Sequence, residues 1–139
     1  MQQPHPDRTD ELRRRLRAAA VGTLLPPDLL MPERGRRLAA TAVVVAGPGD
    51  LTPYLDRLAA AEPDLAAWDG RVEALPADGS PRHRVAIVDR YGQVYEVTDA
   101  DAAQQLPDAA ALEEWFRFLA TACPECGVLD DPVASGPVP

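Results

Sequence analysis

Residues 85–97 read VAIVDRYGQVYEV, and this stretch carries the strongest indication of the fold in the chain. Residues 85–89 are a strong strand candidate because apolar and β-branched side chains come together there. Residues 90–92 supply a turn that ends in glycine, and residues 93–97 alternate polar and apolar side chains, as a half-exposed strand does. The stretch therefore predicts a β-hairpin.

A further strand is predicted by residues 41–46, TAVVVA, which form a continuous apolar run. A strand covered on both faces has this pattern, and such strands usually lie in the middle of an α/β sheet. Residues 47–50, GPGD, form a turn whose final aspartate caps a helix that extends from Leu51 toward Trp68. Pro63 forces a kink or a break in that helix, and residues 71–75 are a short strand candidate.

A last helix is predicted from residue 109 to about residue 122, with Asp108 as its cap and Pro124 beyond its end. Apolar side chains repeat along it at helical spacing and predict a buried stripe: Leu112, Trp115, Phe116 and Leu119. The aromatic side chains of this helix are expected to serve the core. Because Trp115, Phe116 and Phe118 cannot all face inward, one of them could mark a contact surface.

The order of these elements predicts the fold class. A strand, a helix and a second strand form a parallel pair with a right-handed crossover, and the hairpin adds antiparallel strands. We therefore expect an α/β protein with a mixed sheet of about four strands flanked by helices. This is the skeleton of a thioredoxin-like three-layer sandwich in shortened form.

Residues 1–40 are more basic than the rest of the chain, with eight arginines against five acids, whereas residues 41–139 have six against seventeen. We expect a disordered tail over residues 1–9, and a basic helical extension and linker over residues 10–40, in which Asp10 caps the helix. The thioredoxin-like domain is predicted over residues 41–127, and a disordered Pro-rich tail over residues 128–139. The arginines are expected to be solvated or to pair with the protein's own acids. An acidic partner or a membrane surface is the alternative.

The formal net charge of −8 makes nucleic acid an improbable partner for the main domain, because an acidic body repels phosphates. No window is apolar enough for a membrane span, and the first residues do not resemble a secretory segment. Two cysteines are too few for a disulfide framework. We therefore expect a protein of the reducing cytoplasm.

Both cysteines lie in one short motif, residues 123–127, CPECG. The spacing of Cys123 and Cys126 brings two sulfurs close enough to share a metal ion or to form a small disulfide. Ser80, Ser135 and the pair Asp99 and Asp101 lack the context of a catalytic site. Cys123 and Cys126 are therefore the candidate catalytic residues and, in an alternative interpretation, the candidate metal ligands.

Two stretches resemble a known family. Residues 85–95 resemble the closing hairpin of redoxin and peroxiredoxin-like proteins, in which a strand ends in Asp, turns at Gly and returns. Residues 115–127, WFRFLATACPECG, resemble the end of a group of bacterial redoxin-domain proteins that close in a helix and CPECG. The resemblance implies a thioredoxin fold and thiol redox or antioxidant chemistry.

The chain departs from that family at the usual active site. Redoxins place the attacking cysteine after the first central strand, where a helix N-terminus lowers the pKa of the thiol. Here residues 47–52 read GPGDLT, without a cysteine. The family's cis-proline has Pro81 as its nearest counterpart, and the helix between the second strand and the hairpin is missing. We therefore expect a shortened redoxin without the usual active-site cysteine.

Three interpretations of the dithiol stay open. As a redox pair, Cys123 and Cys126 would be slow, because they follow the C-terminal end of a helix and Arg117 is the only cation nearby in sequence. As a zinc site they supply two of four ligands, and His83, His5 or a second copy of the chain would have to complete it. As inert thiols they would only cap the helix. His83, between two arginines, is expected to be a surface residue.

The leading functional hypothesis is a redoxin-related protein in thiol redox or antioxidant chemistry, which exchanges with a protein thiol through Cys123 and Cys126. The hypothesis requires no cofactor. The alternative is a non-catalytic thioredoxin-fold interaction module, in which the CPEC motifs of two subunits in a homodimer share a zinc ion. Enzyme activity, as an oxidoreductase or a degenerate peroxiredoxin, is left open by the sequence.

Overall fold

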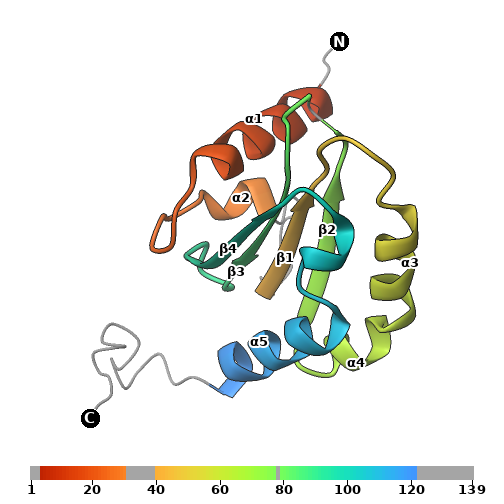
Figure 1. Cartoon of the computed structure of the whole chain (residues 1–139). Coiled ribbons are helices and arrows are strands. Elements are labelled where there is room, and N and C mark those ends of the chain that lie inside the picture. Colours follow the sequence, from red (N-terminus) through yellow and green to blue (C-terminus); the bar gives the residue numbers. More distant parts are fainter. Residues whose placement is uncertain (1–3, 31–39, 78, 122–139) are drawn as a thin grey trace.

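The apolar run predicted as a central strand forms β1 (Ala40–Val45), and all its residues are buried. The computed structural model describes residues 4–30, 40–77 and 79–121. β1 pairs in parallel with β2 (Gly70–Leu75) and antiparallel with β3 (His83–Val88). β4 (Val94–Ala100) pairs antiparallel with β3, which gives a four-stranded sheet of order β2-β1-β3-β4 (Figure 1).

One face of this sheet is covered by α3 (Thr52–Ala60), α4 (Glu62–Ala66) and α5 (Ala109–Thr121). The predicted break is confirmed: α3 ends before Ala61, and Pro63 lies in the first turn of α4. A short 3-10 helix, η1 (Ala103–Gln105), precedes α5. Alternate strand residues point into this layer: Ala42, Val44, Val85 and Ile87. They form one apolar cluster with helix residues that include Leu58, Leu112 and Phe116.

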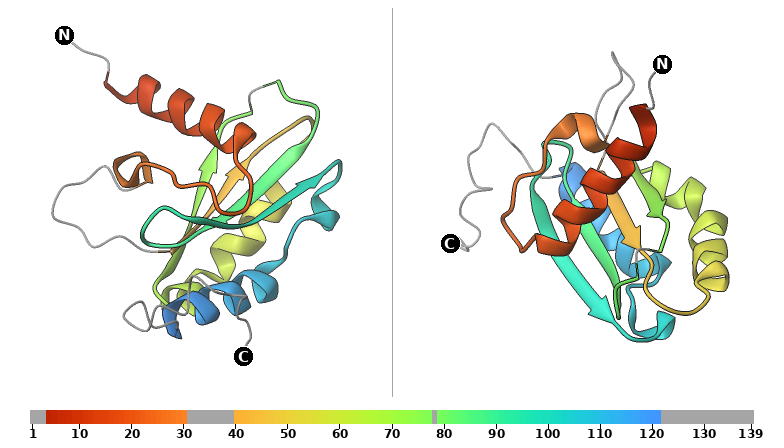
Figure 2. Two further views of the ribbon diagram at one scale, coloured as in Figure 1. Left: turned by 90° about the vertical axis from the view of Figure 1, so that its left-hand side faces the viewer. Right: turned by 90° about the horizontal axis from the view of Figure 1, so that it is seen from above.

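The opposite face is covered by α1 (Pro4–Ala18) and α2 (Pro27–Leu30), which precede the sheet in the chain (Figure 2). Leu12 and Leu16 of α1 are completely buried. They belong to a second apolar cluster with the strand residues that point away from α3 and α5: Val43, Val45, Ala86, Val88 and Val94. The sheet is therefore the middle layer of three.

Two expectations for the N-terminal part are wrong. The helix begins at Pro4 and not after Asp10, so residues 4–9 are helical and not a disordered tail. The basic segment is also no extension, because Leu12 and Leu16 complete the core on one face of the sheet. The predictions for residues 1–3 and 128–139 concern residues outside the described part of the chain.

The fold class predicted from the sequence is confirmed: a mixed four-stranded sheet lies between helical layers, with the strand order and directions of a small thioredoxin-like sandwich. Between β2 and β3 the chain has no helix in the described residues 76–77 and 79–82. The sheet face that such a helix would cover is covered by α1 and α2. The fold thus lacks a helix between β2 and β3, and helices from the N-terminal part of the chain cover the sheet in its place.

Arg84 of β3 fastens α1 to the sheet. Its Nη1 donates to the carbonyl oxygens of Leu16, Arg17 and Ala19, at the C-terminal end of α1 and just beyond it, at 2.6, 3.2 and 3.0 Å. Its Nε and Nη2 donate to the two carboxylate oxygens of Asp99 on β4 at 2.7 and 2.9 Å. The hydrogen bonds from Arg84 lower the pKa of Asp99.

The arginines of α1 pair with acids of the same chain, as expected for one of the two interpretations of the basic segment. Arg8 forms an ion pair with Glu73 of β2 at 3.0 Å. Within the helix Arg13 pairs with Asp10, and both Arg14 and Arg15 pair with Glu11. Three of the four arginines in residues 10–17 thus have an acidic partner within the helix.

The turn of the β-hairpin also holds the segment after α1. The carboxylate of Asp89 accepts hydrogen bonds from the backbone N–H groups of Tyr91 and Gln93, both at 2.9 Å. Gly92 has φ of 95°, and a Cβ atom there would lie 2.3 Å from the carbonyl oxygen of Leu25. The N–H of Leu25 donates to the carbonyl of Gly92 at 2.7 Å. Gly92 is therefore required both by the turn and by this close approach.

Candidate functional site

The two cysteines of the predicted site, Cys123 and Cys126, lie outside the described residues. The structure does place the helix that leads to them, because α5 ends at Thr121. Among the described residues there is no group of three or more His, Cys, Asp or Glu side chains that could hold a metal ion. Of the two histidines considered as further ligands, His5 lies in α1 and His83 starts β3.

The surroundings of the end of α5 offer little stabilisation to a thiolate. The last turn of α5 contains no basic residue. Arg117, the cation nearest to the cysteines in sequence, lies with its guanidinium 5.9 Å from the centroid of the Trp68 ring. A helix C-terminus carries partial negative charge, which disfavours an anionic sulfur. Both observations fit a dithiol that exchanges slowly.

The loop after β1, where redoxins carry their attacking cysteine, is a structural turn in this chain. The backbone N–H of Gly47 donates to Nδ1 of His83 at 2.8 Å. A Cβ atom on Gly47 would lie 2.5 Å from the backbone carbonyl carbon of Arg82, so the loop packs tightly against the start of β3. Asp50 accepts a hydrogen bond from the N–H of Thr52 at 3.0 Å. The N-cap position of α3 is, however, Leu51, so Asp50 lies one residue before the position predicted for it.

The expectation that His83 is a surface residue is wrong, because only 3% of it is exposed. The flanking arginines suggested the surface, but His83 is in phase with Val85 and Ile87 along β3, and both point into the core. Its ring is needed there as an acceptor for Gly47. The described residues contain no cis peptide bond, so Pro81 does not reproduce the cis-proline of the redoxins.

Replacing His83 by leucine should lower the free energy of unfolding by about 1 to 3 kcal/mol, because the buried N–H of Gly47 then has no acceptor. Asparagine can place its Oδ1 where Nδ1 of the imidazole lies, so His83→Asn should recover most of the loss. Urea denaturation followed by circular dichroism measures both. Equal stabilities for the leucine and asparagine variants would show that the hydrogen bond to Gly47 contributes nothing.

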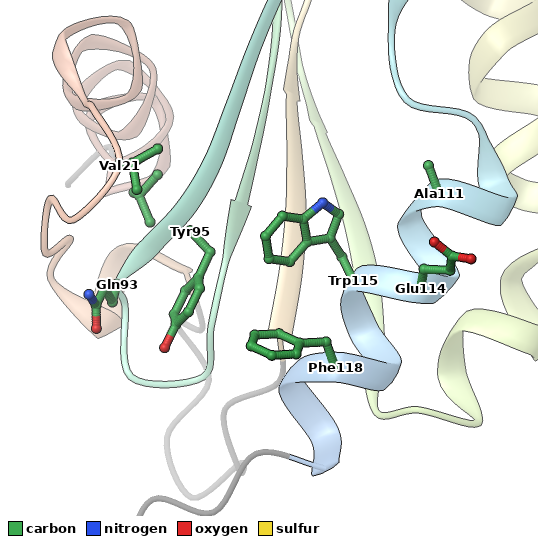
Figure 3. A pocket seen from close by; sticks show the side chains of 8 residues that line it. Val21, Gln93, Tyr95, Ala111, Glu114, Trp115 and Phe118 are labelled. Atoms are coloured by element: carbon green, nitrogen blue, oxygen red, sulfur yellow. The ribbon is translucent and has the colours of Figure 1, made fainter. Parts of the chain in front are cut away.

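The described residues form a groove of about 580 Å³ between β4 and α5. Figure 3 shows side chains from three parts of the chain around it: the segment after α1, the first half of β4 and one face of α5. We call it the β4–α5 groove, and it is lined by Val21, Gln93, Val94, Tyr95, Ala111, Glu114, Trp115 and Phe118. Its lining is mainly apolar.

Three aromatic rings form one wall of the β4–α5 groove. Tyr95 lies 6.3 Å from both Trp115 and Phe118, and Trp115 lies 5.9 Å from Phe118, measured between ring centroids. All three pairs meet edge to face, which is a preferred geometry worth about 0.5 to 1.5 kcal/mol for each pair. The cluster is therefore a rigid aromatic surface.

A β-bulge directs Tyr95 toward α5. Val94 lies opposite Val88 and Glu96 lies opposite Ile87, so the register of the two strands shifts at Tyr95. Bulges of this kind re-aim a side chain and bend the strand locally. Figure 3 shows the Tyr95 ring directed into the space between β4 and α5.

Exposed apolar side chains gather around the same groove. In the part of the chain that the structure describes, the exposed large hydrophobic residues are Val21, Leu24, Tyr91 and Phe118, with exposed fractions of 63, 68, 52 and 50%. Val21 and Phe118 line the groove, and Leu24 forms a β-bridge with the lining residue Gln93. Phe116, in contrast, is fully buried, which confirms that the aromatic residues of α5 are divided between core and surface.

The chain matches no protein-family model, and it shows no significant similarity to a curated protein or to a solved structure. The resemblance to redoxins remains a prediction. No helix among the described residues is both long and apolar enough to cross a lipid bilayer.

The sequence pattern alone did not reveal the β4–α5 groove, although part of its lining has a periodic signal. Ala111, Glu114, Trp115 and Phe118 recur at helical spacing, and they form a second stripe beside the core stripe of Leu112 and Phe116. Tyr95 and Val21 have no such signal, because the first depends on the bulge and the second on the path of the segment after α1.

Proposed function

We propose that this is a redoxin-related protein in thiol redox or antioxidant chemistry, in which Cys123 and Cys126 form a reversible dithiol–disulfide couple. The observation that supports the proposal is a thioredoxin-like sheet whose β1–α3 loop holds no thiol and is closed by the contact between Gly47 and His83. Cys123 and Cys126 are the only cysteines of the chain. Thiol exchange therefore depends on this pair.

The exchange takes place with a disulfide of a protein partner. The thiolate of one cysteine attacks a sulfur of the partner's disulfide, a mixed disulfide forms, and the partner's other sulfur leaves as a thiolate that takes up a proton. The second cysteine, as thiolate, then attacks the mixed disulfide and releases the partner's remaining sulfur. Cys123 and Cys126 lose two electrons in total, and the partner gains two.

The surroundings of α5 suit a slow, reversible couple better than rapid peroxide reduction. Fast attack requires a thiolate held by a helix N-terminus or by positive charge. The motif instead follows the C-terminus of α5 in sequence, and the guanidinium of Arg117 is placed over Trp68. We therefore expect thiols that react no faster than a free cysteine at the same pH.

A titration of free thiols in glutathione buffers of known potential tests the proposal. We expect one two-electron transition, which changes the ratio of oxidised to reduced protein tenfold for about every 30 mV. The variants Cys123→Ser and Cys126→Ser should both lose this transition. A wild-type pair that stays reduced even in the most oxidising buffer would refute the proposal.

A second candidate function is a non-catalytic interaction module, which the exposed aromatic wall of the β4–α5 groove favours. In this alternative two copies of the chain contribute Cys123 and Cys126 to one tetrahedral zinc ion with four thiolate ligands. Zinc analysis of the same purified sample separates the two candidates. One zinc per two chains, with loss of the dimer on chelation, would support the module, whereas metal-free monomers with a redox transition would support the couple.

A further inference from the structure

We infer that the β4–α5 groove is the docking site of residues 132–139 of the same chain. The inference does not depend on the redox proposal, because it rests on the groove and on the sequence that follows α5. The groove combines a rigid aromatic wall with exposed apolar side chains from α5 and from the segment after α1. Exposed apolar patches of this kind usually mark an interaction site.

The occupant follows first from where the chain leaves the described structure. Phe118 lies in the last turn of α5, and the chain continues beyond Thr121 from that end of the groove. Residues 122–131 then act as the connection to residues 132–139. A random coil of ten residues has a root-mean-square span of about 17 Å, which exceeds the roughly 10 Å from Phe118 back to Ala111 along α5.

Composition gives the second argument. Residues 132–139 read PVASGPVP, without a single charged side chain and with three prolines. Proline-rich segments favour the extended polyproline II conformation, which exposes its side chains and loses little entropy on binding. Grooves lined by aromatic side chains bind such segments in many recognition domains. Residues 132–139 therefore match the aromatic wall in chemical type.

Charge explains why the docked segment begins after Asp130 and Asp131. Among the described residues that line the groove, Glu114 is the only charged one, and Asp130 and Asp131 would be repelled by it. Residues 132–139, which have no charged side chain, enter the groove without this repulsion. The acidic pair then lies in the connection, outside the groove.

The chain's own segment is favoured over a second copy for two reasons. A tethered segment has an effective concentration in the millimolar range, far above the protein concentration in a typical solution. Each copy also carries a formal net charge of −8, so association of two copies is opposed by repulsion. Even weak intramolecular docking would therefore be populated.

Nuclear Overhauser effects in the full-length chain with labelled valine methyl groups test the inference. We expect contacts from Val133 and Val138 to ring protons of Tyr95, Trp115 and Phe118, with intensities that do not change on dilution. The double variant Val133→Asp/Val138→Asp should lower the docking equilibrium constant by at least about tenfold, because two apolar side chains lose their burial. Since the variant has no valine at these positions, the loss is measured from the chemical shifts of the ring protons of Tyr95, Trp115 and Phe118. The matched variant Gln2→Asp/Gln3→Asp adds the same charge elsewhere and should keep the contacts.

Each other outcome would overturn the inference. The absence of contacts between these valines and the three rings would show that the segment does not dock. Contacts seen only between labelled and unlabelled copies in a mixed sample would assign the groove to a second chain. The double variant Cys123→Ser/Cys126→Ser should retain the contacts, so a failure of docking and a failure of the redox couple are observed separately.

Discussion

Replacing Leu16 by alanine should lower the free energy of unfolding by about 2 to 5 kcal/mol, the range for deleting a fully buried leucine side chain. Leu16 is completely buried and belongs to the apolar cluster between α1 and the sheet. Such a loss is a large fraction of the total stability of a small domain, about 5 to 15 kcal/mol. Urea denaturation followed by circular dichroism gives the value.

Leu24 provides the matched control for this substitution. It lies in the segment after α1, but 68% of it is exposed. Leu24→Ala should therefore change the free energy of unfolding by no more than about 0.5 kcal/mol. If Leu16→Ala and Leu24→Ala had equally small effects, α1 would not be a layer of the domain, and the original expectation of a helical extension would be restored.

Replacing Arg84 by glutamine should lower the free energy of unfolding by about 2 to 4 kcal/mol, because several charge-assisted hydrogen bonds are lost together. The change releases the carbonyl groups at the end of α1 and leaves Asp99 without its bidentate partner. The Arg84 side chain is only 14% exposed, so water replaces these bonds poorly. Chemical denaturation and the protection of α1 amides from hydrogen exchange measure the effect.

Arg82 is the control on the same strand region. It forms a single ion pair with Asp101 at 3.1 Å, and the two side chains are 51 and 77% exposed. Exposed pairs of this kind are worth roughly 0 to 1 kcal/mol, so Arg82→Gln should have little effect. Equal losses for the two glutamine variants would mean that the contacts of Arg84 to α1 do not contribute to stability.

The stability difference between wild type and Arg84→Gln should also depend on pH. Arg84 lowers the pKa of Asp99 from its ordinary value of 3.8, so the carboxylate stabilises the fold above that value. This contribution is lost as the pH falls through the lowered pKa, because the unfolded chain takes up the proton more readily. The Asp99 part of the difference should therefore shrink below about pH 4 and be constant near neutrality.

The sequence was sufficient for elements whose signal is local. The apolar run of β1, the turn residues of the hairpin and the break at Pro63 are all confirmed, because each depends on a few neighbouring side chains. The parallel pairing of β1 with β2 followed from connectivity alone. Such features survive in almost any packing of the chain.

Features that depend on distant contacts were not predictable in the same way. The helical spacing of Leu12 and Leu16 in the sequence is enough to indicate that α1 buries one side, but not that a sheet face without its own helix is available to it. His83 was expected at the surface because its neighbours in sequence are charged. Its burial follows instead from the alternation of inward and outward residues along β3. The β4–α5 groove requires the bulge at Tyr95, and no pattern of neighbouring residues predicts this bulge.

The origin of the second helical layer has a consequence for synthesis on the ribosome. α1 leaves the ribosome first, whereas β3 and β4, which carry much of the surface that it covers, are made about 80 residues later. At a translation rate of 5 to 20 residues per second, roughly 4 to 16 s pass before β3 and β4 are made and can cover the apolar side of α1. During this interval the nascent chain exposes the apolar side of α1, with Leu12 and Leu16, and a chaperone can bind it.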